Sequence, residues 1–158
     1  MEKFWKILGY IWTLPITLIG LVYVLAFSFV GWYRWTGVVG DALVWNINLD
    51  KLPPRPAKFW TKWSGHTFGQ VVVLKYTLDT EKGKVLLIHE TEHVHQHMKL
   101  GVFMPLMFSI VYLSIKFGCE SADPFLDNSF EISARRRAGQ VVDVIGALRK
   151  LREQHHTH

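Results

Sequence analysis

An uncharged stretch near the N-terminus restricts the possible folds of this chain more than any other feature. No Asp, Glu, Lys or Arg occurs within Ile7–Tyr33, and Lys6 and Arg34 stand at its two ends. A helix needs about 20 apolar residues to cross a bilayer, and the part that begins at Pro15 supplies about 19. Proline suits the first turn of a helix. We therefore expect residues 1–35 to be a membrane anchor, with an interfacial lead-in before Pro15 and one membrane helix after it.

A cleaved signal peptide and a buried core helix are the two alternatives to a retained anchor. The uncharged stretch ends in the sequence GWYRW at 31–35, which is typical of an aromatic membrane border and not of a small-residue cleavage site. A chain of 158 residues has about the length of one domain, too small to enclose so long an apolar helix easily. Both points favour an anchor that stays attached.

Composition and charge favour a lipid partner over a nucleic-acid partner. The chain is 49% hydrophobic and contains seven Trp, ten Phe and five Tyr, and its formal net charge is +5. A basic chain suits an anionic membrane surface as well as it suits nucleic acid. The aromatic residues lie mainly in uncharged runs, and no nucleic-acid-binding motif accompanies the basic residues. We therefore expect contact with a lipid membrane and none with nucleic acid.

Residues 36–153 are expected to form one α+β domain, mainly helical, with a small β-sheet. One short strand is predicted within Gly37–Leu49, and a stronger β pattern lies within Phe68–Leu78. The proline-rich stretch Asp50–Gly65 between them is expected to be an extended surface loop, with Trp60 and Trp63 resting on lipid headgroups.

Helices are expected in the second half of this domain. Asp79 and Thr80 offer capping oxygens for a helix from about Glu81 to Lys99. The uncharged run Leu100–Ile115 reaches only about 24 Å as a helix, so it could dip into the membrane, lie along it or pack inside the domain. After turns at Ser121–Ser129, an amphipathic helix is expected from Phe130 to about Arg152. Residues 154–158 are expected to be a flexible His-rich tail.

One motif on the expected helix carries a specific chemical prediction. His89-Glu90-Thr91-Glu92-His93 satisfies the pattern H-E-x-x-H. Residues four apart share a helix face, so both imidazoles can bind one zinc ion. Glu90 is offset by about 100° and lies beside the metal, where it can take a proton from a metal-bound water. The motif predicts hydrolysis of peptide bonds, with His89 and His93 as metal ligands and Glu90 as catalytic base.

A polar helix face in a His-rich segment is the simpler explanation of the same five residues. Three features favour the metal site. The motif follows a β-rich segment, whose edge could pair with a substrate backbone. Apolar residues on both sides, Val85–Ile88 and the run from Leu100, indicate burial of His89 and Glu90, which is costly without a metal partner. A carboxylate also occurs downstream at the start of a helix.

A catalytic zinc site takes three protein ligands, and its third must be a His or a carboxylate because Cys119 is the only cysteine. We predict Glu131, since it opens a helix and small Ala134 follows three positions later, which allows close approach to the motif helix. In the alternative, Asn128 and Glu131 form a capping box and Glu131 only closes its own helix. Three further carboxylates remain in reserve: Glu120, Asp123 and Asp127.

The remaining polar residues near the motif are assigned lesser roles. Gln96 returns almost to the face of His89 and is the expected hydrogen-bond partner of a ligand. His95 and His97 lie elsewhere around the helix and are expected to be solvated or at the edge of the core. The tail histidines receive no role: His155, His156 and His158.

The motif, Gln96, an apolar run and the Phe-Glu-x-x-Ala sequence at 130–134 together resemble the zincin metallopeptidases of the gluzincin type. The chain is especially similar to short bacterial and phage versions with an N-terminal hydrophobic segment that contains a Leu-Pro pair, here Leu14-Pro15. The resemblance spans about residues 14 to 135. It implies a minimal zincin domain, a location at the bacterial inner membrane, Zn²⁺ as cofactor, and site residues as follows: ligands His89, His93 and Glu131, and general base Glu90.

The pattern departs from the family at one position. Larger gluzincins usually place an Asp four residues after the ligand Glu, where this chain has Arg135. No residue is clearly marked to stabilise an oxyanion, and His66 and Tyr112 are candidates only by residue type.

These features predict a membrane-associated zinc peptidase that acts on a protein or peptide. The first alternative is a non-catalytic membrane protein that uses the His/Glu cluster for structural metal binding or metal sensing. The second is a membrane interaction protein with a degenerate motif that binds no metal. Positive charge on both sides of the expected anchor leaves its orientation open, and the sequence does not specify the substrate or the oligomeric state.

Overall fold

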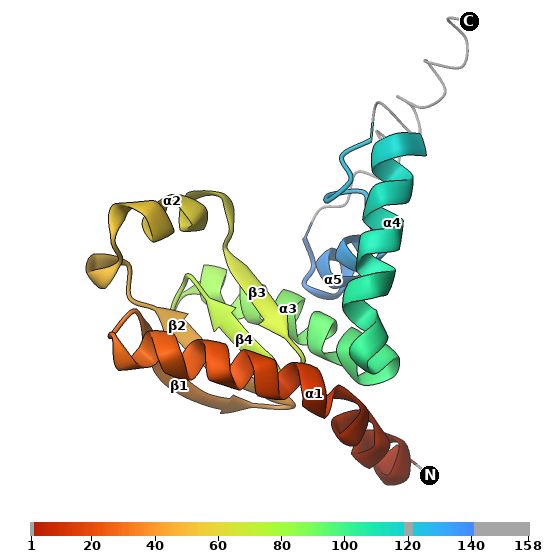
Figure 1. Ribbon diagram of the computed structural model, residues 1–158, viewed down its shortest axis with the longest axis horizontal. Helices are drawn as coiled ribbons and strands as arrows, with labels where there is room; N and C mark the ends of the chain where they lie inside the picture. Colours follow the sequence, from red (N-terminus) through yellow and green to blue (C-terminus); the bar gives the residue numbers. More distant parts are fainter. Residues whose placement is uncertain (1, 119–121, 141–158) are drawn as a thin grey trace, which may run out of the picture.

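The computed structural model of the protein describes residues 2–118 and 122–140 and has an α+β fold, which confirms the fold class expected from the sequence (Figure 1). The elements, in chain order, are α1 (Glu2–Phe29), β1 (Tyr33–Val39), β2 (Ala42–Ile47), the 3-10 turn η1 (Leu49–Lys51), α2 (Pro54–Lys62), β3 (Gly65–Phe68), β4 (Val71–Leu74), α3 (Glu81–Leu100), the 3-10 turn η2 (Gly101–Phe103), α4 (Met104–Gly118) and α5 (Ser129–Arg137).

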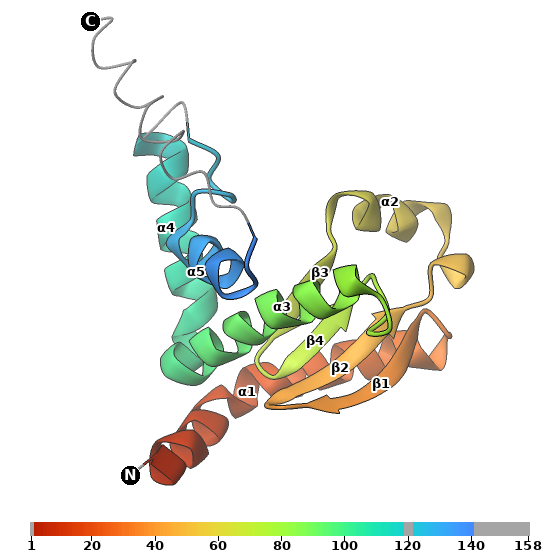
Figure 2. The same cartoon turned by 180° about the vertical axis from the view of Figure 1, so that it is seen from behind.

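The four strands form one mixed sheet in the order β1-β2-β4-β3. Strands β2 and β4 run parallel, and the other two neighbouring pairs are antiparallel. Helix α1 covers one face of the sheet and α3 the other, while α4 stands away from the sheet at the end of α3 with α5 beside it (Figures 1 and 2). Strand β3 is an edge of the sheet and lies on the side nearest α4 and α5 (Figure 1).

Helix α1 is continuous, so the expected division at Pro15 is wrong. Proline lacks the N–H that would bond to the carbonyl of Ile11, which weakens a helix without always ending it. Figure 1 shows the helix changing direction in its N-terminal half, the usual consequence of an internal proline. The residues before Pro15 are therefore part of the same helix, not a separate lead-in.

One face of α1 is built of small residues and packs on the sheet. A Cβ atom added at Gly20 would lie 2.9 Å from the Cβ atom of Phe68 and 3.0 Å from that of Val71. The hydroxyl of Thr17 accepts a hydrogen bond from the backbone N–H of Gln70 at 3.1 Å. Val24, further along the same face, is fully buried in the core. The expected anchor is thus also a structural layer of the domain.

A polar contact fixes the beginning of α1. Lys6 forms an ion pair with Asp41 at 2.7 Å, and the Tyr10 hydroxyl donates a hydrogen bond to the same carboxylate at 2.5 Å. Asp41 lies in the tight turn between β1 and β2, and His95 of α3 approaches it at 3.7 Å. Three elements that are distant in sequence meet at this carboxylate.

Both expected strands are interrupted by turns. The stretch Gly37–Leu49 contains the end of β1 and all of β2, which form a hairpin, and the pattern Phe68–Leu78 contains the end of β3 and all of β4. Gly40 and Gly69 supply the turns with φ values of +59° and +62°, a conformation that glycine adopts without strain. The four residues of β4 are all buried because helices cover both faces of the sheet.

The prediction of an extended loop over Asp50–Gly65 is wrong, since this stretch contains most of η1 and all of α2. Pro54 and Pro56 lie in the first turn of α2, where the backbone N–H groups have no partner within the helix, so proline costs little there. Trp60 does not rest on headgroups: its side chain is 2% exposed and belongs to the core between α1 and the sheet.

The helix that carries the motif is confirmed. Thr80 caps α3 by accepting a hydrogen bond from the backbone N–H of Gly83 at 3.0 Å. The helix ends at Gly101, whose φ of +57° and closeness to the ring of Trp12 exclude a side chain. The run Leu100–Ile115 then becomes η2 and most of α4.

Asn128 caps α5, since its side chain accepts a hydrogen bond from the backbone N–H of Phe130 at 3.1 Å. The expectation of one continuous helix from Phe130 to about Arg152 is wrong, because α5 ends at Arg137 and the chain turns at Gly139, whose φ is +66°. Residues 141–152, the tail 154–158, Cys119 and Glu120 lie outside the described residues.

Two helical segments are long and apolar enough to cross a membrane by length and composition. They are Lys3–Phe29 in α1 and Glu81–Gly118, which joins α3, η2 and α4. Only 22% of the apolar window of the first segment and 11% of that of the second are buried inside the protein. Large apolar surfaces of this kind are uncommon on monomeric soluble proteins and mark contact with a membrane or with another protein.

Candidate metal centre

Packing of α5 on α3 brings three potential metal ligands together. The Nε2 atoms of His89 and His93 are 3.3 Å apart. The two carboxylate oxygens of Glu131 face this pair: Oε2 lies 3.4 Å from Nε2 of His89, and Oε1 lies 3.4 Å from Nε2 of His93. All three side chains are almost completely buried. Within residues 2–118 and 122–140, this is the group of His and carboxylate side chains whose ligand atoms are close enough to hold one metal ion.

These separations match the geometry of zinc. Zinc in proteins is usually tetrahedral, with bonds of about 2.0–2.2 Å to His nitrogen and carboxylate oxygen, so neighbouring ligand atoms are about 3.3 Å apart. The two Nε2 atoms are 3.3 Å apart, and each lies 3.4 Å from one of the two oxygens of the Glu131 carboxylate. Two imidazoles and one carboxylate are also a donor set typical of catalytic zinc.

Hydrogen bonds orient both imidazoles toward the centre of the cluster. The Nδ1 atom of His93 is 2.8 Å from Oε1 of Gln96, and Nδ1 of His89 is 3.1 Å from Oε1 of Gln140. The amide of Gln96 is itself fixed, because its Nε2 donates to the carbonyl of Phe130 at 3.0 Å. Because an amide oxygen only accepts hydrogen bonds, each Nδ1 carries a proton, so in the neutral form of each imidazole the Nε2 lone pair faces the other ligands.

Charge in the cluster also suits a cation. Burial opposes ionisation of Glu131, but hydrogen bonds from His89 and His93 lower its pKa to about 2. Burial likewise opposes a charge on His93, but Glu131 outweighs it and raises the pKa of this imidazole to about 9. Metal ions and protons compete for the same imidazole nitrogen. The carboxylate that stabilises a protonated imidazole therefore also stabilises a metal cation in its place.

Glu90 lies beside these ligands and is held by β3. Its carboxylate accepts a hydrogen bond from the Thr67 hydroxyl at 2.7 Å. A Cβ atom added at Gly65 would lie 2.5 Å from Oε1 of Glu90, so β3 approaches the carboxylate closely. Burial raises the pKa of Glu90, while the neighbouring His93 and His89 act in the opposite direction. A buried carboxylate with a raised pKa is suited to accept and return a proton near neutral pH.

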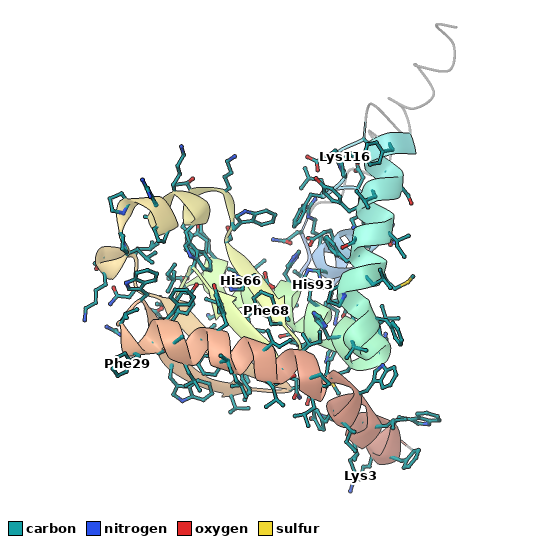
Figure 3. All side chains as sticks on the ribbon, in the orientation of Figure 1. Lys3, Phe29, His66, Phe68, His93 and Lys116 are labelled. Atoms are coloured by element: carbon teal, nitrogen blue, oxygen red, sulfur yellow. The ribbon has the colours of Figure 1, made fainter. Side chains whose placement is uncertain are left out.

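The cluster opens into a cleft of about 790 Å³. Helix α3 contributes His89, Glu90 and His93 to the cleft, and α5 contributes Glu131. Strand β3 forms one side of the cleft, and α4 with the loop before α5 forms the other. Figure 3 shows His93 facing this space between β3 and α4. The expectation that the motif lies near a strand edge agrees with the position of β3, which is an edge strand and lines the cleft.

Neither residue considered for oxyanion stabilisation belongs to the ligand group, although His66 lines the same cleft. Side chains alternate along a strand, so Thr67 faces Glu90 while His66 and Phe68 face α1 (Figure 3). The ring of His66 packs against Tyr23 and Trp60, with ring centroids 5.5 and 5.1 Å apart, and burial lowers its pKa to about 4. Tyr112 is not among the described residues that line the cleft.

The other histidines of α3 lie apart from the ligand group. His95 approaches Asp41 at 3.7 Å and Glu92 at 3.8 Å. His97 lines the cleft and is buried, and burial together with the nearby His93 lowers its pKa to about 4.

The remaining candidates from the sequence have separate surroundings. The reserve ligands Asp123 and Asp127 hold the loop before α5, where their carboxylates accept hydrogen bonds from backbone N–H groups. Arg135 lines the cleft at the position where larger gluzincins carry Asp. Sequence reasoning missed Thr67 and Gln140, which reach the site from other elements.

Comparison with known proteins adds no relative: no family model, no curated protein and no solved structure matches this chain. The fold and the site therefore define the class directly. The protein is an α+β protein with a buried His-His-Glu cluster in a cleft and two apolar helices at its surface.

Proposed function

We propose that the protein is a membrane-attached zinc peptidase with a minimal zincin domain of the gluzincin type. The observation that carries the proposal is that the Nε2 atoms of His89 and His93 lie 3.3 Å apart and each lies 3.4 Å from an oxygen of the Glu131 carboxylate, with both Nδ1 atoms hydrogen-bonded outside the cluster. Coordination of one tetrahedral Zn²⁺ explains this spacing and also explains why these polar groups are buried together.

The remaining residues supply the chemistry of hydrolysis around such a site. His89, His93 and Glu131 would hold the zinc ion, which would lower the pKa of a bound water and polarise the substrate carbonyl. Glu90 accepts the proton of that water and passes it to the leaving amine, a transfer that its raised pKa favours. Thr67 holds one carboxylate oxygen of Glu90, which fixes the direction of the other. Strand β3, an edge strand that lines the cleft, can pair with the backbone of a peptide.

A peptidase fits the site better than structural metal binding does. A structural zinc site is closed by four protein ligands, whereas a catalytic site keeps one position for water. The ligand group within residues 2–118 and 122–140 has three members. The next acidic side chain, Glu90, is hydrogen-bonded to Thr67 and is not part of the ligand group.

Membrane attachment is proposed from the outer faces of α1 and α4. Exposed apolar side chains on α1 include Ile11, Leu18 and Val22, and those on α4 include Ile110 and Leu113. Strand β1 is an open sheet edge in contact with α1, and unpaired backbone groups are not tolerated in hydrocarbon. We therefore favour attachment along one leaflet over an anchor that crosses the bilayer. The resemblance to short bacterial versions makes the inner membrane the proposed location.

The test is the variant Glu90→Gln compared with Glu92→Gln. Both remove one carboxylate charge from α3, but only Glu90 lies at the proposed reaction centre, while Glu92 contacts Ser133 and His95. With zinc bound, Glu90→Gln should lower hydrolysis of a quenched-fluorescence peptide library by about 10²–10⁴-fold. Glu92→Gln should stay near wild type, and both variants should retain about one zinc per chain. Undiminished hydrolysis by Glu90→Gln, or loss of zinc from it, would contradict the role of Glu90.

A further inference from the structure

Helix α4 has two apolar faces with different neighbours. On one face, Met104 and Phe108 line the cleft above the metal centre. On the other face, Leu106, Ile110 and Leu113 are each about half exposed. The helix carries no charged residue before Lys116. The same helix is therefore both a wall of the cleft and part of the outer apolar surface.

This outer surface continues onto α1. The rings of Trp12 and Phe103 are in contact, with centroids 5.9 Å apart, and Gly101 lies directly against Trp12. Both helices lie at the front of the molecule in Figure 1 and at the back in Figure 2. A bilayer that contacts α1 therefore also contacts α4, the helix that borders the cleft.

Apolar side chains dominate the walls of the cleft. They come from both sides and include Phe68 of β3, Phe108 of α4 and Phe125 of the following loop. Figure 3 views the molecule from the side of α1 and α4, and in it Phe68 and His93 lie in the angle between these two helices. The metal centre is thus approached between apolar walls on the side that carries the lipid-facing surface.

We propose that the substrates are apolar peptide segments bound in the membrane, which enter the cleft from the bilayer surface along α4. This inference rests on the proposed peptidase function and specifies its substrate class. A segment that moves from lipid into the cleft exchanges one apolar environment for another, so its side chains are not exposed to water on the way. Confinement of enzyme and substrate to one surface also raises their effective concentration.

The test compares one apolar quenched-fluorescence peptide in two forms, with and without an N-terminal palmitoyl chain. The protein is reconstituted on vesicles of phosphatidylcholine and phosphatidylglycerol. We expect kcat/KM for the palmitoylated peptide to exceed that for the free peptide by at least about 10-fold, as confinement to one surface predicts. The Glu90→Gln variant should also bind the palmitoylated peptide more tightly than the free peptide. Because this variant does not cleave the peptide, its affinity measures recognition alone.

Two surface variants test whether the preference for the palmitoylated peptide depends on the outer face of α4. The double substitution Ile110→Glu and Leu113→Glu places charge on the outer face of α4 and should abolish the preference while cleavage of the free peptide persists. Val38→Glu is the control, because Val38 is 64% exposed but lies on β1. Equal cleavage of both peptides by wild type, or a preference that survives the double substitution, would overturn the inference about the substrate. Neither result would contradict the proposed peptidase function. Preferential binding by Glu90→Gln without cleavage by wild type would instead overturn the peptidase proposal.

Discussion

Glu131 stands in the first turn of α5, where a carboxylate can either cap its own helix or reach a neighbouring one. The side chain of Asn128 satisfies the helix start, and the Glu131 carboxylate lies 3.4 Å from two imidazoles of α3. The cap is thus formed by Asn128, while the Glu131 carboxylate faces the imidazoles of His89 and His93. Each can be removed separately.

We predict that Glu131→Gln lowers zinc content after dialysis from about one ion per chain to a small fraction of that, since a neutral amide replaces the anionic ligand. Asn128→Ala, the matched control, should keep its zinc and lose about 1 kcal/mol of unfolding free energy, the usual cost of a helix cap. Metal analysis and thermal unfolding measure the two effects. Equal zinc content in both variants would assign Glu131 a structural role only.

Thr67 is the residue that sequence reasoning had least chance to find. Its hydroxyl reaches Glu90 from β3, and no pattern within a short window joins residues that are 23 positions apart. Gln140 is similar, since it meets His89 only because the chain turns back after α5. In contrast, His89, Glu90 and His93 were predictable, because one helical turn fixes their relative positions.

We predict that Thr67→Val lowers kcat/KM about 10-fold while KM and zinc content stay close to wild type, because it frees the Glu90 carboxylate without touching a ligand. Thr67→Ser keeps the hydroxyl and should restore most of the activity. Steady-state kinetics on one peptide substrate measure both variants. A loss in the Ser variant as large as in the Val variant would indicate a packing defect and not a hydrogen bond.

At the level of elements, the helices with clear boundary signals were predictable and the short elements were not. Thr80 marks the start of α3 by its own side chain, and the helix begins where the sequence predicts. Helix α2 was missed because its prolines are typical of loops and are tolerated in a helix only in the first turn. The sheet was underestimated because two glycine turns divide stretches that look like single strands.

Helix α1 is apolar enough to contact lipid, but it also packs on the sheet at Gly20 and so contributes to the stability of the domain. We predict that Gly20→Val destabilises the protein by about 1–3 kcal/mol, since the new side chain must displace Phe68 or Val71. Leu18→Ala is the control, because Leu18 is about half exposed on the outer face of the same helix and makes no such contact. Chemical unfolding in a fixed detergent measures both. An unfolding free energy of Gly20→Val equal to that of the control would mean that α1 does not pack on the sheet.

For the whole molecule, the site lies where three layers meet. Helix α3 carries the motif and covers one face of the sheet. The edge strand β3 holds Glu90 through a hydrogen bond from Thr67, and α5 places Glu131 beside His89 in the cleft. Most of the helices and the motif were predictable from the sequence, but their arrangement was not. Residues 1–35 were expected to form a membrane anchor outside the domain, whereas α1 covers the other face of the sheet. The arrangement leaves apolar side chains of α1 and α4 exposed and places the candidate ligands in an open cleft.

A crystal structure of the zinc-loaded protein, with anomalous scattering recorded at the zinc edge, tests the central claim most directly. We predict one strong peak at about 2.0–2.2 Å from the Nε2 atoms of His89 and His93 and from an oxygen of Glu131, with a solvent molecule as the fourth ligand. A peak elsewhere, a fourth protein ligand that closes the site, or no bound zinc would contradict the account.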